Sequence, residues 1–204
     1  SNCWKFDSTT GITATDSGSG GNNGTTNGMA TGGTSTVSGW QGCGKLASCL
    51  SFDGTNDYLN ILGKDSGNIT DGNFSLDFLY KPESIADEAK DTIIDKKNIA
   101  ADLQVTFIAN PTGAGNGGKI QFYMDNVAGA GGITEFRTTS VLLTAGSWSH
   151  IALVYDDALA CGSGKVTIYH NNASAGLTQV SCAGGNSPSI TDQGLIIGKL
   201  ANAA

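Results

Sequence analysis

The sequence predicts an all-β protein folded as a two-sheet antiparallel sandwich. The strongest indication is residues 146–156, GSWSHIALVYD, because alternate positions form two faces that are both largely apolar. Such a strand is expected inside a sandwich, buried on both faces, rather than with one wet face. A second strand-like run follows at 165–170 after the polar turn 161–164, so the two runs are predicted to form a hairpin.

The composition agrees with this fold class. The 204 residues include 30 Gly and only 3 Pro, and charged residues make up 14% of the chain. Most acidic residues are Asp, and Arg137 is the only Arg, which suits a sheet protein with few helices. The length suits one domain, which we predict to span residues 1–204.

Charge and hydropathy argue against several function classes. With 18 acidic against 11 basic residues, the formal net charge is -7, and such a surface repels nucleic acid. No apolar run approaches the length of a membrane-spanning helix. The chain opens without the apolar segment of a signal peptide. We therefore expect an extracellular or cell-surface protein whose signal peptide has been removed.

The five cysteines favour disulfides over a metal site. None lies at the spacing of a structural zinc site, and the chain has two His. Disulfides imply an oxidising compartment. Cys161 and Cys182 bracket two strand-like runs and would meet if those strands pair. Cys43 with Cys49 is the next pairing, with Cys3–Cys49 or Cys3–Cys43 as rivals. The odd cysteine is expected to be a free buried thiol, with a link to another chain as the alternative.

The N-terminal third is predicted to hold a strand, a long loop and a hairpin. Residues 3–7 alternate as a strand does, and residues 8–39 are a Gly/Ser/Thr/Asn tract with almost no apolar content. A tight turn at 53–57 then joins two alternating runs into a hairpin. Asp53 and Asp57 are expected to be turn residues whose carboxylates accept nearby backbone N–H groups.

The rest of the chain is predicted to be a series of strands. Pro82 ends the first of them, and residues 83–90 are compatible with one short helical turn. Besides the central hairpin, the predicted strands are 74–80, 92–95, 103–107, 119–124, 134–138, 177–180 and 194–198.

Several motifs, in order along the chain, resemble one family. GSWSHIALVYD and GKVTIYHNN resemble the paired core strands of laminin-G-like domains, in the concanavalin A-like lectin/glucanase superfamily. LSFDGTNDYLNI (50–61) is similar to that family's Phe-Asp-Gly-x-x-Asp-Tyr segment. WKFDSTTGITATDSGSGGNNGT (4–25) is similar to its opening strand and loop, and GNFSLDFLYKP (72–82) follows in the right order. The resemblance implies a jelly-roll sandwich of the concanavalin A type.

The loop at 8–39 has two interpretations. The first is a plain surface loop. The second is a cation-holding loop, because Asp16, Asn22 and Asn23 lie among glycines that let backbone carbonyls turn inwards. The resemblance favours calcium here, with Asp7, Asp16 and Asn22 as the candidate ligands.

Catalysis is not expected. Glucanases of the superfamily place two carboxylates on one strand, in a Glu-x-Asp-x-x-Glu or similar arrangement. Residues 83–88 do not match that spacing, and Glu135 has no acidic partner at strand spacing. His150 is interpreted as a core histidine, and His170 as an exposed residue at a strand end.

The resemblance implies a non-catalytic module for adhesion or glycan binding, whose partner is a glycan or a surface protein. The alternative is a subunit of a surface filament or layer that binds copies of itself. The family's usual last strand is absent after residues 194–198, and an open sheet edge recruits strands from other chains. A glucanase-like enzyme is the second alternative. No sugar-stacking aromatic is assigned, although Trp40 is the only Trp outside a predicted core strand.

Overall fold

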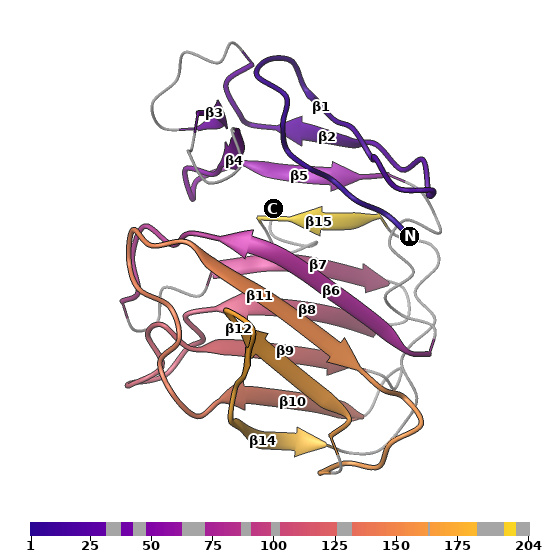
Figure 1. Cartoon of the computed structure of the whole chain (residues 1–204), viewed down its shortest axis with the longest axis vertical. Coiled ribbons are helices and arrows are strands. Elements are labelled where there is room, and N and C mark those ends of the chain that lie inside the picture. The colour runs from indigo at the N-terminus through magenta and orange to yellow at the C-terminus, as the bar shows by residue number, and fades with distance from the viewer. Residues whose placement is uncertain are drawn as a thin grey trace. The chain divides into compact units, whose positions relative to one another are not determined.

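The fold is all-β, as the sequence predicts. The computed structural model describes residues 1–31, 38–42, 48–62, 72–86, 91–98, 103–125, 132–162, 164–182 and 194–198. Within these ranges it contains antiparallel strands, turns and no helix (Figure 1). Accordingly, no helix in the described part of the chain could cross a membrane.

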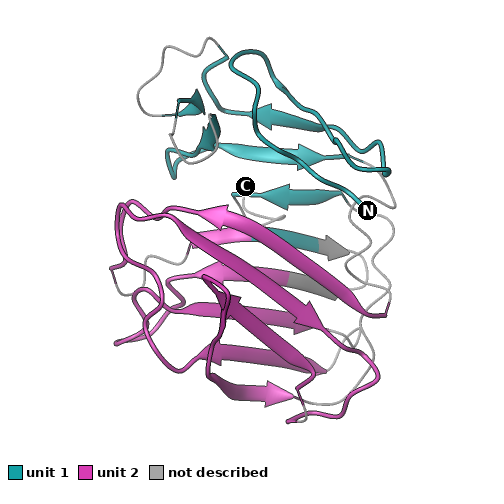
Figure 2. Ribbon diagram, in the orientation of Figure 1, with its two compact units in different colours: residues 1–67, 94–96, 192–204 teal, residues 68–93, 97–191 magenta. Residues whose placement is uncertain are grey.

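Two compact units make up the chain (Figure 2). Unit 1 contains residues 1–67, 94–96 and 192–204, and unit 2 contains residues 68–93 and 97–191. Each unit is considered by itself below. The single domain predicted over residues 1–204 stays a prediction.

Unit 2 is a two-layer sandwich of antiparallel strands. One sheet has the order β13-β12-β11-β6, and the other includes β8-β9-β10-β14 beside residues of β7 (Figure 1). The first sheet contains β6 (Phe74–Tyr80), β11 (Ser149–Tyr155), β12 (Val166–His170) and β13 (Ala173–Ser174). The second contains β7 (Asp91–Asn98), β8 (Leu103–Ala109), β9 (Ile120–Asp125), β10 (Ile133–Thr138) and β14 (Leu177–Cys182).

Aromatic rings join the two layers of unit 2. Phe74 stacks on Tyr155 with ring centroids 5.1 Å apart, and Phe122 of the other sheet lies 6.3 Å from Phe74 and 6.0 Å from Tyr155. Phe78 meets Phe107 edge to face at 5.3 Å. Aromatic residues contribute the most buried area per side chain in a core. These contacts therefore fix which face of each sheet points inwards.

Strand β11 has one solvent face, so the prediction that both its faces are buried is wrong. Alternate side chains from Ser149 to Tyr155 are buried. On the other face, Val154 is 42% exposed, and His150 and Ala152 are half-buried. The four-stranded sheet is packed on one face only. An outer face that carries His150, Ala152 and Val154 is compatible with water and does not indicate a second layer.

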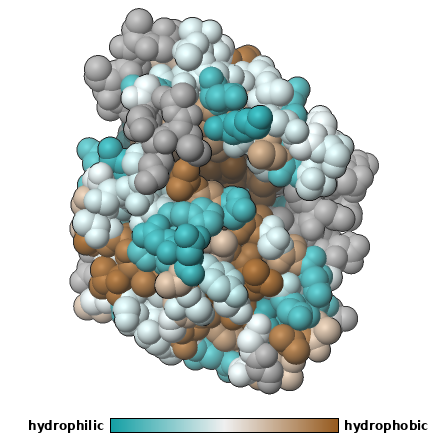
Figure 3. All heavy atoms as spheres, viewed as in Figure 1, coloured by the Kyte–Doolittle hydropathy of each residue, from teal (hydrophilic) through white to brown (hydrophobic). Residues whose placement is uncertain are grey.

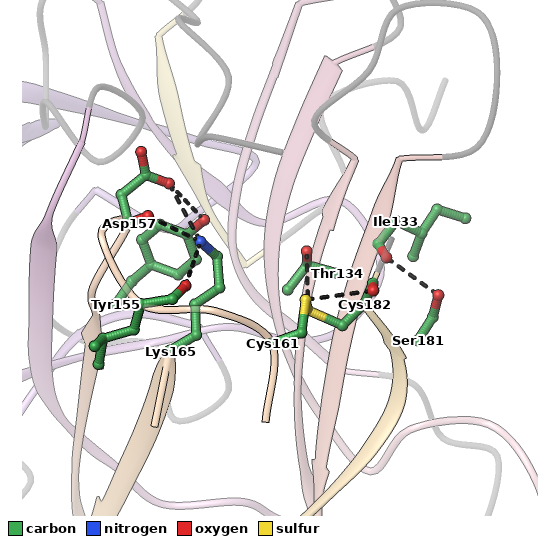
Figure 4. The surroundings of a disulfide bond; sticks show 9 residues. Ile133, Thr134, Tyr155, Asp157, Cys161, Lys165, Ser181 and Cys182 are labelled. Carbon is green, nitrogen blue, oxygen red and sulfur yellow. Dashed lines mark hydrogen bonds and ion pairs between the residues drawn. A yellow bond between two sulfur atoms is a disulfide. The ribbon is translucent and has the colours of Figure 1, made fainter. Parts of the chain in front are cut away.

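The predicted hairpin of β11 and β12 is present, and a disulfide lies beside it (Figure 4). Cys161, in the connection between the strands, is bonded to Cys182 at the end of β14, with Cα atoms 5.8 Å apart. Lys165 is buried, and its Nζ donates to the carbonyl oxygens of Asp157 and Leu159 at 3.1 Å. The ammonium thereby holds the connection in a closed turn.

Unit 1 has strands where the sequence predicts only a loop. β1 and β2 lie inside residues 8–39 and are built mainly from Thr and Gly. Their apolar partner is β5, whose Leu59 and Ile61 are fully buried. An added Cβ at Gly24 would lie 2.8 Å from Cδ1 of Leu59, so a larger residue there would displace that buried side chain. The strands are β1 (Thr13–Ala14), β2 (Gly24–Asn27), β3 (Gly39–Gln41), β4 (Cys49–Ser51), β5 (Tyr58–Ile61) and β15 (Leu195–Ile197).

β15, the last strand in the described residues, does not have an open edge beside it. β15 pairs with β5 on one side and with Ile94 and Asp95 of β7 on the other. In this unit the edge strand of the larger sheet is β1, which has two residues. The open row of backbone groups expected from the missing family strand is thus not found next to β15.

Two N-terminal predictions need correction, and burial rules out Trp40 as a sugar-stacking residue. Residues 3–7 form no strand beyond one bridge between Trp4 and Asp16, because Phe6 has φ +53°, a conformation that interrupts a strand. Trp40 is 2% exposed, so it cannot stack on a sugar. Cys3 is the free cysteine in the described residues, and its thiol is exposed, not buried.

Two further predictions fall partly outside the described residues. Cys49 is disulfide-bonded, but Cys43, its predicted partner, lies outside them. Residues 83–86 are not helical, and the rest of the helical turn predicted at 83–90 is outside the described part of the chain.

Removing the Cys161–Cys182 bond should destabilise the protein. The bond joins residues 21 positions apart, and the loss of such a cross-link is expected to lower the free energy of unfolding by about 3 kcal/mol. Denaturant unfolding of the double variant Cys161→Ser, Cys182→Ser measures this. Cys3→Ser is the control and should leave the stability unchanged. Equal stabilities of the double variant and the wild type would contradict the prediction.

Candidate functional site

A hollow of about 290 Å³ opens in unit 2 between the edges of its two sheets. Strands β12 and β13 bound it on one side, and β10 and β14 on the other. The connection between β11 and β12 closes its rim. The lining residues are Phe136, Gly162, Gly164, Val166, Thr167, Ser174, Ala175, Leu177 and Gln179.

The disulfide and two glycines position the rim of this hollow. Gly162 and Gly164 have φ of +79° and +85°, which glycine adopts without strain, so the chain turns sharply after Cys161. The bond to Cys182 fixes that turn beside β14 (Figure 4). An added Cβ at Gly162 would lie 3.8 Å from Oε1 of Gln179, so the glycine leaves the Gln179 amide accessible.

The lining combines an apolar floor with uncharged polar groups. Phe136 and Val166 are buried and form the floor. Thr167, Ser174 and Gln179 are the polar residues of the lining, and the side chains of Thr167 and Ser174 lie on the face of the four-stranded sheet opposite to that of Val166. None of these three side chains has a hydrogen bond to another residue in the described ranges. No lining residue is ionisable. Such a site can bind a small neutral molecule with hydroxyl groups.

The calcium ligands predicted in the N-terminal loop are only partly brought together. Asp16 is buried; its Oδ1 accepts from the N–H groups of Cys3 and Gly18, both at 2.8 Å, and its Oδ2 accepts from Asn22 N–H at 2.9 Å. Burial alone would raise the pKa of Asp16, but the three N–H donors outweigh it and hold that pKa below its ordinary value. Asp16 is therefore the centre of a backbone turn.

The other predicted ligands contribute less to this cluster. Asn22 donates through its side chain to Oδ1 of Asn2 at 2.9 Å. Asp7 is exposed, and no contact in the described residues joins it to Asp16. Within the same residues, no three His, Cys, Asp or Glu side chains gather closely enough to hold a metal ion.

The turn at 53–57 has the Asp hydrogen bonds that the sequence predicts, but the predicted hairpin is wrong. The strands on either side of the turn do not pair with each other, because β4 pairs with β3 and β5 pairs with β2 and β15. Oδ2 of Asp57 accepts from Asp53 N–H at 2.9 Å, and Oδ1 of Asp53 accepts from Thr55 N–H at 2.8 Å. Asp57 is buried, and its Oδ1 has no hydrogen-bond partner among the described residues. A water or a cation would be stabilised at that oxygen, a feature that the sequence pattern does not reveal.

One family model matches most of the chain. The model, Laminin_G_3, is described as the concanavalin A-like lectin/glucanases superfamily, and it matches residues 53–203.

The chain belongs to this superfamily.

No curated protein matches the chain. The matched range contains all of unit 2, including the hollow, whereas Asp16 and Asn22 lie before it. Membership in the superfamily therefore bears on the hollow more directly than on the N-terminal loop.

Neither histidine of the superfamily motif has the solvent exposure that the sequence predicts. His150 is half-buried on the outer face of β11, not in the core. Nε2 of His170 lies 3.0 Å from Oγ of Ser149 and 3.1 Å from Nδ2 of Asn171. Since Oδ1 of Asn171 accepts from His150 N–H at 2.9 Å, its Nδ2 faces the imidazole and donates to it. Nε2 of His170 therefore accepts a hydrogen bond, which places the proton of the neutral ring on Nδ1.

Neither this pair nor Glu135 is arranged for catalysis. Ser149 is buried, so a substrate cannot reach its hydroxyl. Glu135 forms an ion pair with Arg137 at 3.1 Å, and Arg137 also donates to Oε1 of Gln121 at 3.0 Å. Laminin-G-like domains of the superfamily are typically non-catalytic.

The His170 network should make stability depend on pH. Burial lowers the pKa of His170 below its ordinary value of 6.5. The folded state then binds fewer protons than the unfolded state. Stability from the neutral ring is therefore present above about pH 6.5 and is lost as the pH falls through the folded-state pKa.

We expect the difference in unfolding free energy between the wild type and His170→Gln to be constant above pH 7 and to shrink below about pH 6.5. Denaturant unfolding at a series of pH values measures it. Groups common to both proteins, such as His150, cancel in the difference. A difference that stays constant from pH 5 to pH 8 would show that His170 is not held neutral.

Proposed function

We propose that this protein is a non-catalytic extracellular or cell-surface module that binds a glycan in the hollow beside the Cys161–Cys182 bond. The observation that supports this most is the lining: an apolar floor with uncharged polar residues beside it. The superfamily, which includes lectins, and the disulfide, which forms in oxidising compartments, agree with it.

The size and charge of the hollow favour a sugar over a larger partner. Its volume of about 290 Å³ is at the lower end of small-molecule sites. A sugar ring presents an apolar face to the floor and hydroxyl groups to Thr167, Ser174 and Gln179. A protein partner would require a wider apolar patch than this hollow offers.

Assembly by strand exchange has less support at two of the sheet edges of unit 2. β14 carries a bulge opposite Glu135 and Phe136, which leaves Val180 unpaired and 51% exposed. β13, one edge of the four-stranded sheet, has two residues. Bulges and very short edge strands hinder the addition of a foreign strand. The other edge of that sheet is β6, a regular strand of seven residues. A filament or layer built from copies of this chain is the alternative, and β6 is the edge at which a strand could add.

The glycan proposal predicts that Gln179→Ala weakens binding about five- to thirtyfold, because one uncharged hydrogen-bonding group is lost. A glycan array identifies a ligand, and calorimetry gives the affinities. Thr178→Ala is the matched control, since its side chain is exposed on β14 but does not line the hollow. If the folded wild type binds no glycan on the array, the proposed function is wrong.

Calcium in the N-terminal loop stays a proposal, with Asp7, Asp16 and Asn22 as its ligands. The variant Asp16→Asn tests whether Asp16 binds calcium or has a purely structural role, because it replaces a carboxylate that accepts three N–H bonds. Loss of these bonds should lower the stability by about 1–3 kcal/mol in chelator, and the calcium proposal predicts a larger loss in calcium. A loss that is equal in calcium and in chelator would contradict the proposal. If calcium raises the thermal midpoint of the wild type but not of Asp16→Asn, the ion binds at Asp16.

A further inference from the structure

The outer face of the four-stranded sheet carries an exposed aromatic residue beside the hollow. Tyr169 of β12 pairs with Ala152 of β11 on one side and with Ser174 of β13 on the other. Ala152 in turn pairs with Asp77 of β6. The four residues, here called the Tyr169 row, cross the outer face over roughly 14 Å, since neighbouring strands lie about 4.8 Å apart.

The ring of Tyr169 is open to solvent because its neighbours are small. Tyr169 is 38% exposed. The side chains directly opposite it belong to Ala152 and Ser174, which are too short to cover an aromatic ring. Within the described residues, Tyr169 makes no ring contact and its hydroxyl makes no hydrogen bond. An uncovered aromatic ring of this kind is a stacking surface for a ligand.

The Tyr169 row is continuous with the hollow. Ser174 belongs to both, because it lines the hollow and lies opposite Tyr169. Thr167 also lines the hollow and precedes Tyr169 by two positions in β12, so both side chains point to the same side of the sheet. On the face that carries β6, β11 and β12, hydrophilic and hydrophobic residues lie side by side (Figure 3).

The charges near the hollow and the Tyr169 row indicate which class of ligand can bind there. No ionisable residue lines the hollow, and the charged group of the Tyr169 row is the exposed carboxylate of Asp77. The chain has a formal net charge of -7. Sulfated or carboxylated sugars would be repelled, whereas Asp77 can accept hydrogen bonds from neutral hydroxyl groups.

We propose that the ligand is a neutral glycan chain of two or more rings. One ring occupies the hollow at Thr167, Ser174 and Gln179, and the next ring stacks on Tyr169. Asp77 lies at the far end of the row and accepts hydroxyl groups there. This inference rests on the proposed function and extends it by a second subsite and by the exclusion of acidic glycans.

The test compares a neutral oligosaccharide found on the array with its terminal monosaccharide and with a sulfated chain of similar length. Tyr169→Ala should weaken binding of the oligosaccharide roughly five- to tenfold, because the stacking contact is lost, and leave binding of the monosaccharide unchanged. Tyr169→Phe keeps the ring and should bind the oligosaccharide as the wild type does. Ile12→Ala is the control for removing an exposed apolar side chain elsewhere.

The outcomes separate this inference from the function on which it rests. If the wild type binds the oligosaccharide and Tyr169→Ala binds it equally tightly, the second subsite is wrong and the glycan-binding function stands. If the wild type binds no glycan, the function itself fails. If sulfated chains bind more tightly than neutral ones, and the binding weakens with salt, the neutral class is wrong. Unchanged thermal midpoints of the variants show that they are folded.

Discussion

The contact between Phe74, Tyr155 and Phe122 is the interaction on which the structure of unit 2 depends. The first two rings belong to the four-stranded sheet and the third to the sheet behind it, so their packing brings the layers together. Once Tyr155 points inwards, the alternation of β11 places Ala152 outwards. The register with β12 then places Tyr169 outwards as well. The inner aromatic cluster therefore determines the chemistry of the outer face.

Tyr155 also helps to position the rim of the hollow. The hydroxyl of Tyr155 donates to Oδ1 of Asp157 at 2.9 Å, and that carboxylate lies 3.6 Å from Nζ of Lys165. The buried ammonium also lies 5.1 Å from the centroid of the Tyr155 ring. A buried charge requires such compensation, and here the compensating groups come from the connection between β11 and β12. The connection is thus held at both of its ends, by Lys165 and by the Cys161–Cys182 bond, with the hollow beside it.

Features that depend on residues close together in the chain can be predicted from the sequence. Features that depend on how strands and sheets pack on one another cannot. The β11–β12 hairpin follows from alternation and from the position of a Gly-rich turn. The Cys161–Cys182 bond is predicted correctly, although β12 and β14, whose expected pairing would bring the two cysteines together, lie in different sheets. The solvent face of β11 does not follow, because Ala152 and Val154 suit either environment and only the partner sheet decides between them. β2 is missed because its apolar contacts come from β5. The hollow is missed because residues far apart in the sequence, from Phe136 to Gln179, line it.

Residue type alone does not show whether a polar side chain is already bonded within the protein. A carboxylate in a Gly-rich loop favours a cation site, and the sequence predicts one at Asp16 for that reason. In the folded chain its two oxygens accept three backbone N–H bonds, so its charge is already stabilised by the protein. The amide of Gln179 carries no charge and has no protein partner in the described residues. A group whose hydrogen bonds remain unmade can gain them from a ligand, and that requirement favours the uncharged hollow as the binding site.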